Sequence, residues 1–257
     1  VEDSDSEDFV AGDVVLFVPH NLDDFTGFIE YLVVPPKHLL KLPLGIPLEQ
    51  LAVGQQLGTV VNCCRKLPNP LDMDVVVLGQ GAAGLLFTAL LNNMGARSII
   101  AMDLVADRLQ VAKQLGAIEV IDASKMDPVA VVREITNGDL VDMAIEATGE
   151  LDAINQIPHY IRERGHIALF GIGPAGLVDY AYMDLFRKHP NLISSSRTFE
   201  EEGYRSFKLA MDFIAQGRID VRPLITHRLP FHSVAQAYDL ATTRRDGVVK
   251  VMLDMGA

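Results

Sequence analysis

The chain has 257 residues, of which 49% are apolar, and it carries a net charge of −12. A chain of this length can bury a large core in one or two domains, and its composition is that of a globular protein rather than a disordered one. The acidic balance leaves no basic stripe to neutralise phosphates, so the composition argues against a nucleic-acid partner.

Three features of the sequence bear on the cellular location of the protein: its longest charge-free run, its first residues and its cysteines. The longest run without a charge, residues 75–96, could imitate a membrane helix, but glycines and asparagines interrupt it, so no membrane span is expected. Residues 1–8 are acidic, unlike a secretory signal. Cys63 and Cys64 are adjacent and are expected to be reduced, because neighbouring cysteines rarely bridge without strain. These features favour a cytoplasmic protein.

A strand, a glycine turn, a helix and a second strand are predicted between residues 73 and 103. Val75-Val76-Val77-Leu78 is an apolar, β-branched run, typical of a strand buried on both faces of a parallel sheet. Apolar residues then recur at helical spacing as far as Met94. A second apolar run begins at Ser98 and ends on an acid, Asp103.

Three glycines between that strand and helix have the spacing of a dinucleotide-binding turn. Gly79 permits the tight turn, Gly81 lets a pyrophosphate approach the backbone, and Gly84 allows the helix to pack closely on the strand. The phosphates would bind at the positive helix N-terminus, where Ala82 and Ala83 lie. The sequence therefore predicts a dinucleotide site. The alternative is an α/β protein, such as a methyltransferase, that uses the turn for another ligand.

The acid that ends the second strand indicates which dinucleotide binds. Asp103 lies about 20 positions after Gly84, the spacing expected of an acid that accepts hydrogen bonds from the adenosine ribose hydroxyls. A carboxylate at this position would repel a 2′-phosphate. We therefore predict NAD rather than NADP.

The start of the chain is predicted to be rich in β-strands. Short apolar runs separated by glycine and proline are typical of strands. Three such strands are predicted, at Val14–Val18, Phe28–Val34 and Leu39–Leu42. A helix is predicted over residues 47–67, and it leads into the central strand.

Strands and helices alternate after the second strand of the motif. Further strands are predicted at residues 119–121, 140–146, 166–170 and 192–195. Helices are predicted at residues 105–115 and 127–136, in a segment that ends at Tyr160, and at residues 204–215 and 233–241, before a closing strand at 248–253. This alternation predicts an α/β fold, with a doubly wound parallel sheet whose ligand lies at the carboxyl ends of the strands.

Besides the glycine turn with Asp103, the chain contains a series of short motifs: FVAGDVV at 9–15, GFIEY at 27–31, LGA at 115–117, EATG at 146–149, PLITHRLP at 223–230 and GVVKV at 247–251. Taken in order, these segments resemble the zinc-type medium-chain alcohol and polyol dehydrogenases, with sorbitol- and threonine-type members most similar. The resemblance covers nearly the whole chain. The resemblance implies a GroES-like catalytic domain, incomplete here, formed by residues 1–56 and 197–257 around an NAD-binding Rossmann domain at 57–196.

The resemblance also implies an activity and a set of cofactor contacts. Members transfer a hydride between NAD(H) and an alcohol, polyol or carbonyl substrate, with zinc polarising the substrate oxygen. By matching position, Thr59 would approach the nicotinamide ring and Arg108 would lie near the adenosine ribose. Thr148 and Gly171 would line the nicotinamide side, and Lys250 would reach the pyrophosphate.

The sequence departs from the family pattern at the catalytic zinc. The family's cysteine and Gly-His-Glu ligands correspond to positions upstream of Val1, so zinc is expected only if residues before Val1 supply them. The third ligand position carries Gln55, whose neutral amide is a poorer zinc ligand than a carboxylate. The sequence therefore predicts no metal site within residues 1–257 and identifies no catalytic residue.

Two alternatives and an assembly follow from the same resemblance. Instead of a dehydrogenase, the chain could be an NAD-binding pseudoenzyme or sensor that lacks the catalytic zinc. It could also be a zinc-independent reductase of the same fold, like the quinone reductases. The family suggests a homodimer, or a homotetramer, paired through the last Rossmann strand at about residues 191–196. The identity of the small-molecule substrate is not readable.

Overall fold

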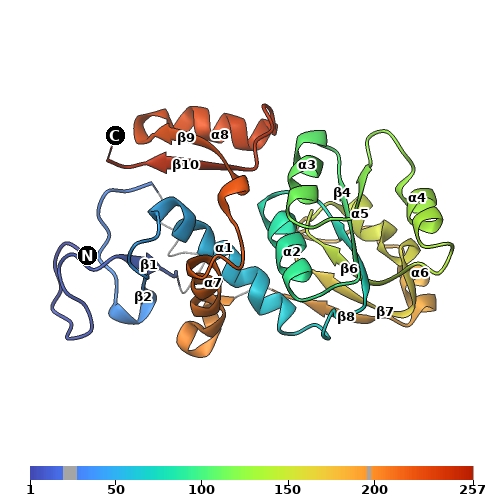
Figure 1. Cartoon of the computed structure of the whole chain (residues 1–257), viewed down its shortest axis with the longest axis horizontal. Helices are drawn as coiled ribbons and strands as arrows, with labels where there is room; N and C mark the ends of the chain where they lie inside the picture. The colour runs from blue at the N-terminus through green and yellow to red at the C-terminus, as the bar shows by residue number, and fades with distance from the viewer. Residues whose placement is uncertain (20–27, 196–197, 257) are drawn as a thin grey trace. The chain divides into compact units, whose positions relative to one another are not determined.

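The computed structural model describes residues 1–19, 28–195 and 198–256. The chain divides into two compact units, the terminal unit (residues 1–61 and 197–257) and the central unit (residues 62–196). Figure 1 labels most of the helices and strands of both. Within the described ranges, no helix combines the length and the apolar character needed to cross a bilayer.

A six-stranded sheet forms the middle of the central unit (Figure 1). Every adjacent pair is parallel, and the order is β5-β4-β3-β6-β7-β8. The strands are β3 (Asp74–Leu78), β4 (Ser98–Asp103), β5 (Glu119–Asp122), β6 (Val141–Glu146), β7 (Ile161–Leu169) and β8 (Asn191–Ser194). This is the doubly wound arrangement of dinucleotide-binding folds, which confirms the predicted α/β class.

Helices cover both faces of this sheet (Figure 1). They are α2 (Ala82–Asn93), α3 (Ala106–Gln114), α4 (Pro128–Ile135), α5 (Leu151–Gln156) and α6 (Tyr182–Lys188). On the α4–α6 face, alternate residues of β3, Val76 and Leu78, pack with Val132 of α4 and with Ile157 in one buried cluster. Because strand side chains alternate between faces, the remaining β3 residues serve the opposite layer. Burial on both faces explains the charge-free run that predicted this strand.

In the part of the terminal unit that the structure describes, there are two small sheets and three longer helices. β1 pairs with β2 in antiparallel register, and β9 pairs with β10 in parallel. The elements are β1 (Val15–Phe17), β2 (Leu39–Lys41), α1 (Leu48–Cys64, whose last residues belong to the central unit), α7 (Arg205–Ala215), β9 (Ile225–Pro230), α8 (Val234–Thr243) and β10 (Lys250–Asp254). Their order shows that both ends of the chain contribute to this unit.

Two glycines let α1 and α7 approach closely in the terminal unit. A Cβ atom at Gly58 would lie 2.3 Å from the Phe207 ring, and one at Gly54 would lie 2.5 Å from Met211. These glycines are one helical turn apart and therefore lie on one face of α1. Phe207 and Met211 are buried there with Leu51 in a common core.

The structure corrects two of the predicted elements and adds two that were not predicted. The strand predicted at Phe28–Val34 is wrong, because within the described residues β1 pairs with β2 and this segment forms no ladder. Its apolar side chains face solvent, and Val33 is 99% exposed. β7 begins at Ile161 rather than at residue 166, and neither α6 nor β9 was predicted as an element. Ser196, in the predicted dimer strand, lies outside the described residues.

Candidate functional site

Four parallel strands of the central unit bring most of the predicted contacts to one edge of the sheet. Leu78 of β3 is in register with Met102 of β4 and with Glu146 of β6, which in turn pairs with Leu169 of β7. The segments after these strands therefore meet at the carboxyl edge. They carry Gly79, Gly81, Ala82, Ala83, Gly84, Asp103, Arg108, Thr148 and Gly171.

The glycine turn after β3 has the geometry that its sequence predicts. Gly79 has a φ of +84°, and a Cβ atom at Gly84 would lie 1.7 Å from the Gly79 carbonyl oxygen. Gly81 is the N-cap of α2 and offers no side-chain cap to the first amides of the helix. A Cβ atom there would have the Arg108 guanidinium as its nearest neighbour, at 3.9 Å. The helix N-terminus thus presents amides and a nearby cation, which together suit an anionic ligand.

Asp103 joins the end of β4 to this turn. Its Oδ2 accepts a hydrogen bond from the Gln80 amide at 2.5 Å, and its Oδ1 accepts one from the Val105 amide at 2.8 Å. The side chain is half-buried, so the carboxylate is held in place and still reaches solvent. A fixed negative charge beside the turn fits ribose hydroxyls and disfavours a phosphate in the same place.

A second turn, after β6, is organised by a carboxylate of its own strand. Glu146 Oε1 accepts hydrogen bonds from the Thr148 amide at 2.7 Å, from the Gly149 amide at 3.0 Å and from the Thr148 hydroxyl. Glu146 is fully buried, and its Oε2 has no hydrogen-bond partner among the described residues. A Cβ atom at Gly171 would lie 2.5 Å from that oxygen, so Gly171 and Glu146 lie in close contact.

The two remaining predicted contacts, Thr59 and Lys250, belong to the terminal unit, and one glutamine connects them. Lys250 Nζ donates to Gln56 Oε1 at 3.1 Å, and the Thr59 hydroxyl donates to the Gln56 carbonyl at 2.7 Å. Desolvation of the half-buried ammonium lowers the pKa of Lys250. Gln55 precedes Gln56 in α1 and is also half-buried.

Sequence reasoning missed Glu146 and Gln80 as residues that shape the site. The side-chain Nε2 of Gln80 donates to the Val77 carbonyl at 3.1 Å, and its Oε1 accepts from the Thr88 hydroxyl at 3.0 Å. These bonds connect the turn to β3 and α2. Glu146 ends an apolar strand just as Asp103 does. That shared signal could have singled it out.

The described residues do not form a metal centre. Among residues 1–19, 28–195 and 198–256, no group of three or more His, Cys, Asp or Glu side chains is arranged to hold a metal ion. Cys63 and Cys64 are buried free thiols, as expected. Burial raises the pKa of Cys63 to about 11 and that of Cys64 well above its usual value, so both stay protonated at neutral pH.

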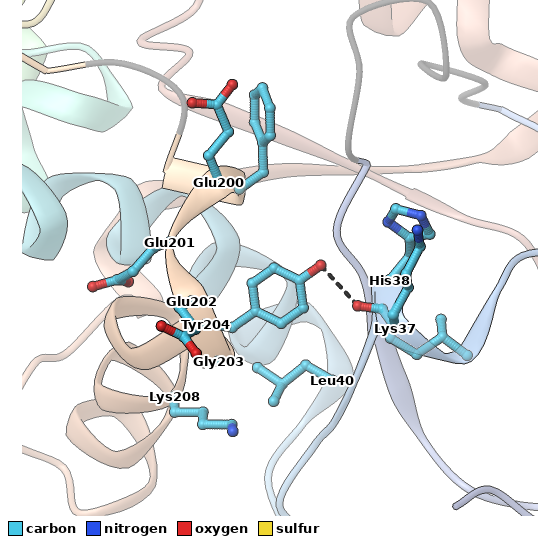
Figure 2. A pocket seen from close by; sticks show the side chains of 11 residues that line it. Lys37, His38, Leu40, Glu200, Glu201, Glu202, Gly203, Tyr204 and Lys208 are labelled. Atoms are coloured by element: carbon cyan, nitrogen blue, oxygen red, sulfur yellow. Dashed lines mark hydrogen bonds between the residues drawn. The ribbon is translucent and has the colours of Figure 1, made fainter.

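The terminal unit contains a pocket of about 390 Å³ (Figure 2). It lies between the segment before β2 and the segment before α7, which the Tyr204 hydroxyl links by donating to the Lys37 carbonyl at 2.8 Å. Its charged groups are of both signs, and Glu201 is already bonded to the Ser206 amide and hydroxyl. The lining residues are Lys37, His38, Leu39, Leu40, Phe199, Glu200, Glu201, Glu202, Gly203, Tyr204 and Lys208. None of them is a predicted site residue.

Comparison with known proteins gives consistent results. The sequence model of the family described as zinc-binding dehydrogenase matches residues 82–216, more than half of the chain. L-threonine 3-dehydrogenase of Proteus mirabilis is 29% identical over 231 residues, covering 88% of this chain and 64% of the relative. Sorbitol dehydrogenase of Gallus gallus is 29% identical over 219 residues, covering 83% of this chain and 58% of the relative. The chain thus spans about three fifths of the length of these relatives.

A solved structure shows the same fold. The structure from Sinorhizobium meliloti 1021 described as a zinc-binding dehydrogenase, solved with NADP bound, superimposes with a TM-score of 0.76 at 25% identity. The superposition covers 88% of this chain and 65% of that one.

Proposed function

This chain belongs to the zinc-binding dehydrogenase family, and from that premise we propose that it binds NAD(H) at the carboxyl edge of the central-unit sheet. We further propose that it takes part in hydride transfer between NAD(H) and an alcohol, polyol or carbonyl compound. The observation that carries the proposal is the bond from the Gln80 amide to Asp103, which fixes an acid beside a glycine turn and a helix N-terminus.

The adenosine and pyrophosphate half of the cofactor would lie along the glycine turn. The amides at the start of α2 would bind the pyrophosphate, which Gly81 leaves room to approach. Asp103 would accept hydrogen bonds from the ribose hydroxyls, and Arg108 would lie beside them. These roles follow from the positions of the amides at the start of α2, which are donors, and of the Asp103 carboxylate, which is an acceptor.

The nicotinamide half would lie along the second turn, with Thr148 and Gly171. We propose that Thr59 and Lys250 of the terminal unit also contact the cofactor. When bound, nicotinamide supplies the carbon that gives or takes the hydride, while the protein orients it and excludes water.

The relatives support a substrate that carries a secondary hydroxyl. One is an L-threonine 3-dehydrogenase and another is a sorbitol dehydrogenase. Threonine and sorbitol are both small polar alcohols. We therefore propose a polyol or hydroxy amino acid, oxidised with NAD⁺.

Cofactor binding is the first test. The full chain is titrated with NADH and with NADPH, and binding is followed by nicotinamide fluorescence. We expect both to bind, with NADH tighter. Failure to bind NADH at millimolar concentration would overturn the proposal, and tighter binding of NADPH would overturn the role of Asp103.

Turnover is a separate test. Formation of NADH is followed with sorbitol or L-threonine as substrate, with added zinc and with a chelator. Zinc-dependent turnover supports the dehydrogenase assignment, whereas activity that survives the chelator would indicate a zinc-independent reductase. Cofactor binding without turnover on any alcohol would indicate a sensor.

We propose in addition that the chain forms a homodimer through β8. β8 is one of the two edge strands of the six-stranded sheet, and Leu192 is 42% exposed there. An exposed edge is a template for pairing with a second copy across a two-fold axis. Light scattering after size exclusion is expected to show a dimer or a tetramer, and a stable monomer would contradict this assembly.

A further inference from the structure

We propose that Glu146 is a positioning residue for the nicotinamide half of the site, acting by holding the Thr148 methyl group, rather than its hydroxyl, against the glycine turn. The inference rests on the proposed function, because it assigns a role within the same cofactor site. It goes beyond that function by naming a residue that touches no ligand and by specifying which atom of Thr148 faces the site.

The hydrogen bonds of Glu146 fix the conformation of the second turn. Three donors, the Thr148 amide and hydroxyl and the Gly149 amide, converge on the single oxygen Oε1. Hydrogen bonds to a charged acceptor are stronger than neutral ones. One carboxylate oxygen therefore sets both the backbone of the turn and the rotamer of Thr148.

The hydroxyl of Thr148 is held within the second turn by two hydrogen bonds. It donates to Glu146 and accepts from the Glu150 amide at 2.9 Å. The methyl group points the other way, and a Cβ atom at Gly79 would lie 2.7 Å from it. Thr148 thus meets the glycine turn, and any dinucleotide laid along it, with an apolar surface.

The second oxygen of Glu146 is unfavourable for folding. Oε2 is buried and has no hydrogen-bond partner among the described residues. It lies where the backbones at Gly149 and Gly171 approach each other closely. A Cβ atom at Gly171 would lie 2.2 Å from the Gly149 amide nitrogen, so little space is left there. An unpartnered buried carboxylate oxygen destabilises the native state. This cost at Oε2 accompanies the hydrogen bonds at Oε1, by which the same carboxylate holds the second turn in place.

The test compares Glu146→Leu and Glu146→Gln with the unaltered full chain. Three quantities are measured: the Kd for NADH, the Kd for ADP-ribose, which lacks nicotinamide, and the midpoint of urea unfolding. We expect Glu146→Leu to weaken NADH roughly tenfold and ADP-ribose less than about twofold. The urea midpoint is expected to fall, because leucine leaves three donors of the turn without their acceptor. The ratio of the two Kd values, and not the midpoint, therefore reports the positioning role. Glutamine keeps an acceptor and should restore most of the NADH affinity.

A matched control is the acid that caps α4. Asp127 also accepts a hydrogen bond from a backbone amide, that of Val129 at 3.0 Å, and it belongs to neither the turn after β3 nor the turn after β6. Asp127→Leu should lower the unfolding midpoint and leave the ratio of the NADH and ADP-ribose affinities unchanged. It therefore separates a general loss of stability from loss of positioning.

A milder variant tests the Thr148 atom directly and does not depend on the folding of Glu146→Leu. Thr148→Ser keeps the hydroxyl and removes the methyl, so we expect about fourfold weaker NADH binding, the value of one buried methyl group. Unchanged NADH affinity in this variant would overturn the inference.

The remaining outcomes also decide the question. If Glu146→Leu weakens NADH and ADP-ribose equally, or weakens neither, the positioning role is rejected. If the unaltered chain binds both ligands and the ratio does not change in Glu146→Leu, the inference fails while the proposed function stands. If the unaltered chain binds neither ligand, the proposed function fails and the inference fails with it.

Discussion

The turn after β3 and the turn after β6 are built on the same plan and differ in the burial of their carboxylate. Each follows a buried parallel strand and contains a glycine with positive φ, Gly79 at +84° and Gly149 at +73°. In each turn an acid accepts hydrogen bonds from backbone amides. Asp103 of the neighbouring strand β4 accepts from the Gln80 amide of the first turn, and Glu146 of β6 accepts from the Thr148 and Gly149 amides of the second. Asp103 is half-buried, whereas Glu146 is 0% exposed.

This difference separates two uses of one motif. A carboxylate that still reaches solvent can bind a ligand and choose between ligands by charge. A carboxylate enclosed by protein can only shape the backbone around it, and it does so at a cost in desolvation. We therefore expect changes in the first turn to alter which dinucleotide binds, and changes in the second to alter how its nicotinamide end is held.

The largest effect is expected from adding a side-chain carbon where α2 packs against the first turn. Gly84→Ala places a Cβ atom 1.7 Å from the Gly79 carbonyl oxygen, so the turn must move away from α2. We expect a loss of about 3 kcal/mol in the free energy of unfolding, and loss of measurable NADH binding. Urea unfolding and fluorescence titration give the two values.

The control for that variant is Gly173→Ala. A Cβ atom there has its nearest neighbour at 3.7 Å, an ordinary contact. Its unfolding free energy should change by less than about 0.5 kcal/mol. Equal losses in the two variants would show that the contact between Gly84 and Gly79 is not what the turn depends on.

Asp103→Asn removes the charge of the first turn and keeps an acceptor for the Gln80 amide. The ratio of NADPH to NADH dissociation constants should fall about tenfold, since repulsion of the 2′-phosphate is relieved. The matched control is Asp107→Asn, which removes a negative charge near the N-terminus of helix α3 and should leave the ratio unchanged. An unaltered ratio in Asp103→Asn would place the 2′-position elsewhere.

The second turn can be tested through its own glycine. Gly149 has a φ of +73°, and a Cβ atom there would lie 2.3 Å from the Ile172 carbonyl oxygen. Gly149→Ala should lower the unfolding free energy by about 2 kcal/mol. It should weaken NADH about fivefold with ADP-ribose unchanged. Equal weakening of both ligands would mean that the two turns do not act on separate halves of the cofactor.

The first turn could be predicted from the sequence because its determinants are local. Gly79, Gly81 and Gly84 lie within six residues, and Asp103 follows at the end of the next strand. Periodicity and glycine spacing report such short-range geometry directly. The six-stranded sheet followed from the same alternation of strand and helix.

The second turn and the terminal unit depend on contacts between distant residues. The enclosure of Glu146 requires β7 to end beside it, and the bond from Lys250 to Gln56 joins residues 194 positions apart. The segment Phe28–Val34 reads as a strand by composition, yet a strand also needs an edge to pair with, and composition does not show one. These features could not be predicted without the three-dimensional arrangement.

The smallest effect is expected from Lys250→Met in the terminal unit, which tests a buried charge through pH. Burial lowers the folded-state pKa of Lys250 below its usual 10.5, so between the two values the unfolded chain binds more protons. The free energy of unfolding of the unaltered chain therefore increases as pH rises through that window. Lys250→Met should lack this gain and bind NADH about threefold more weakly.

Urea midpoints between about pH 7 and pH 10 measure how stability changes with pH. Lys208→Met is the control for loss of a lysine in the same unit. If the urea midpoint changes with pH equally in the two variants, Lys250 is solvated in the folded chain. Lys250 would then behave as a surface lysine despite its bond to Gln56.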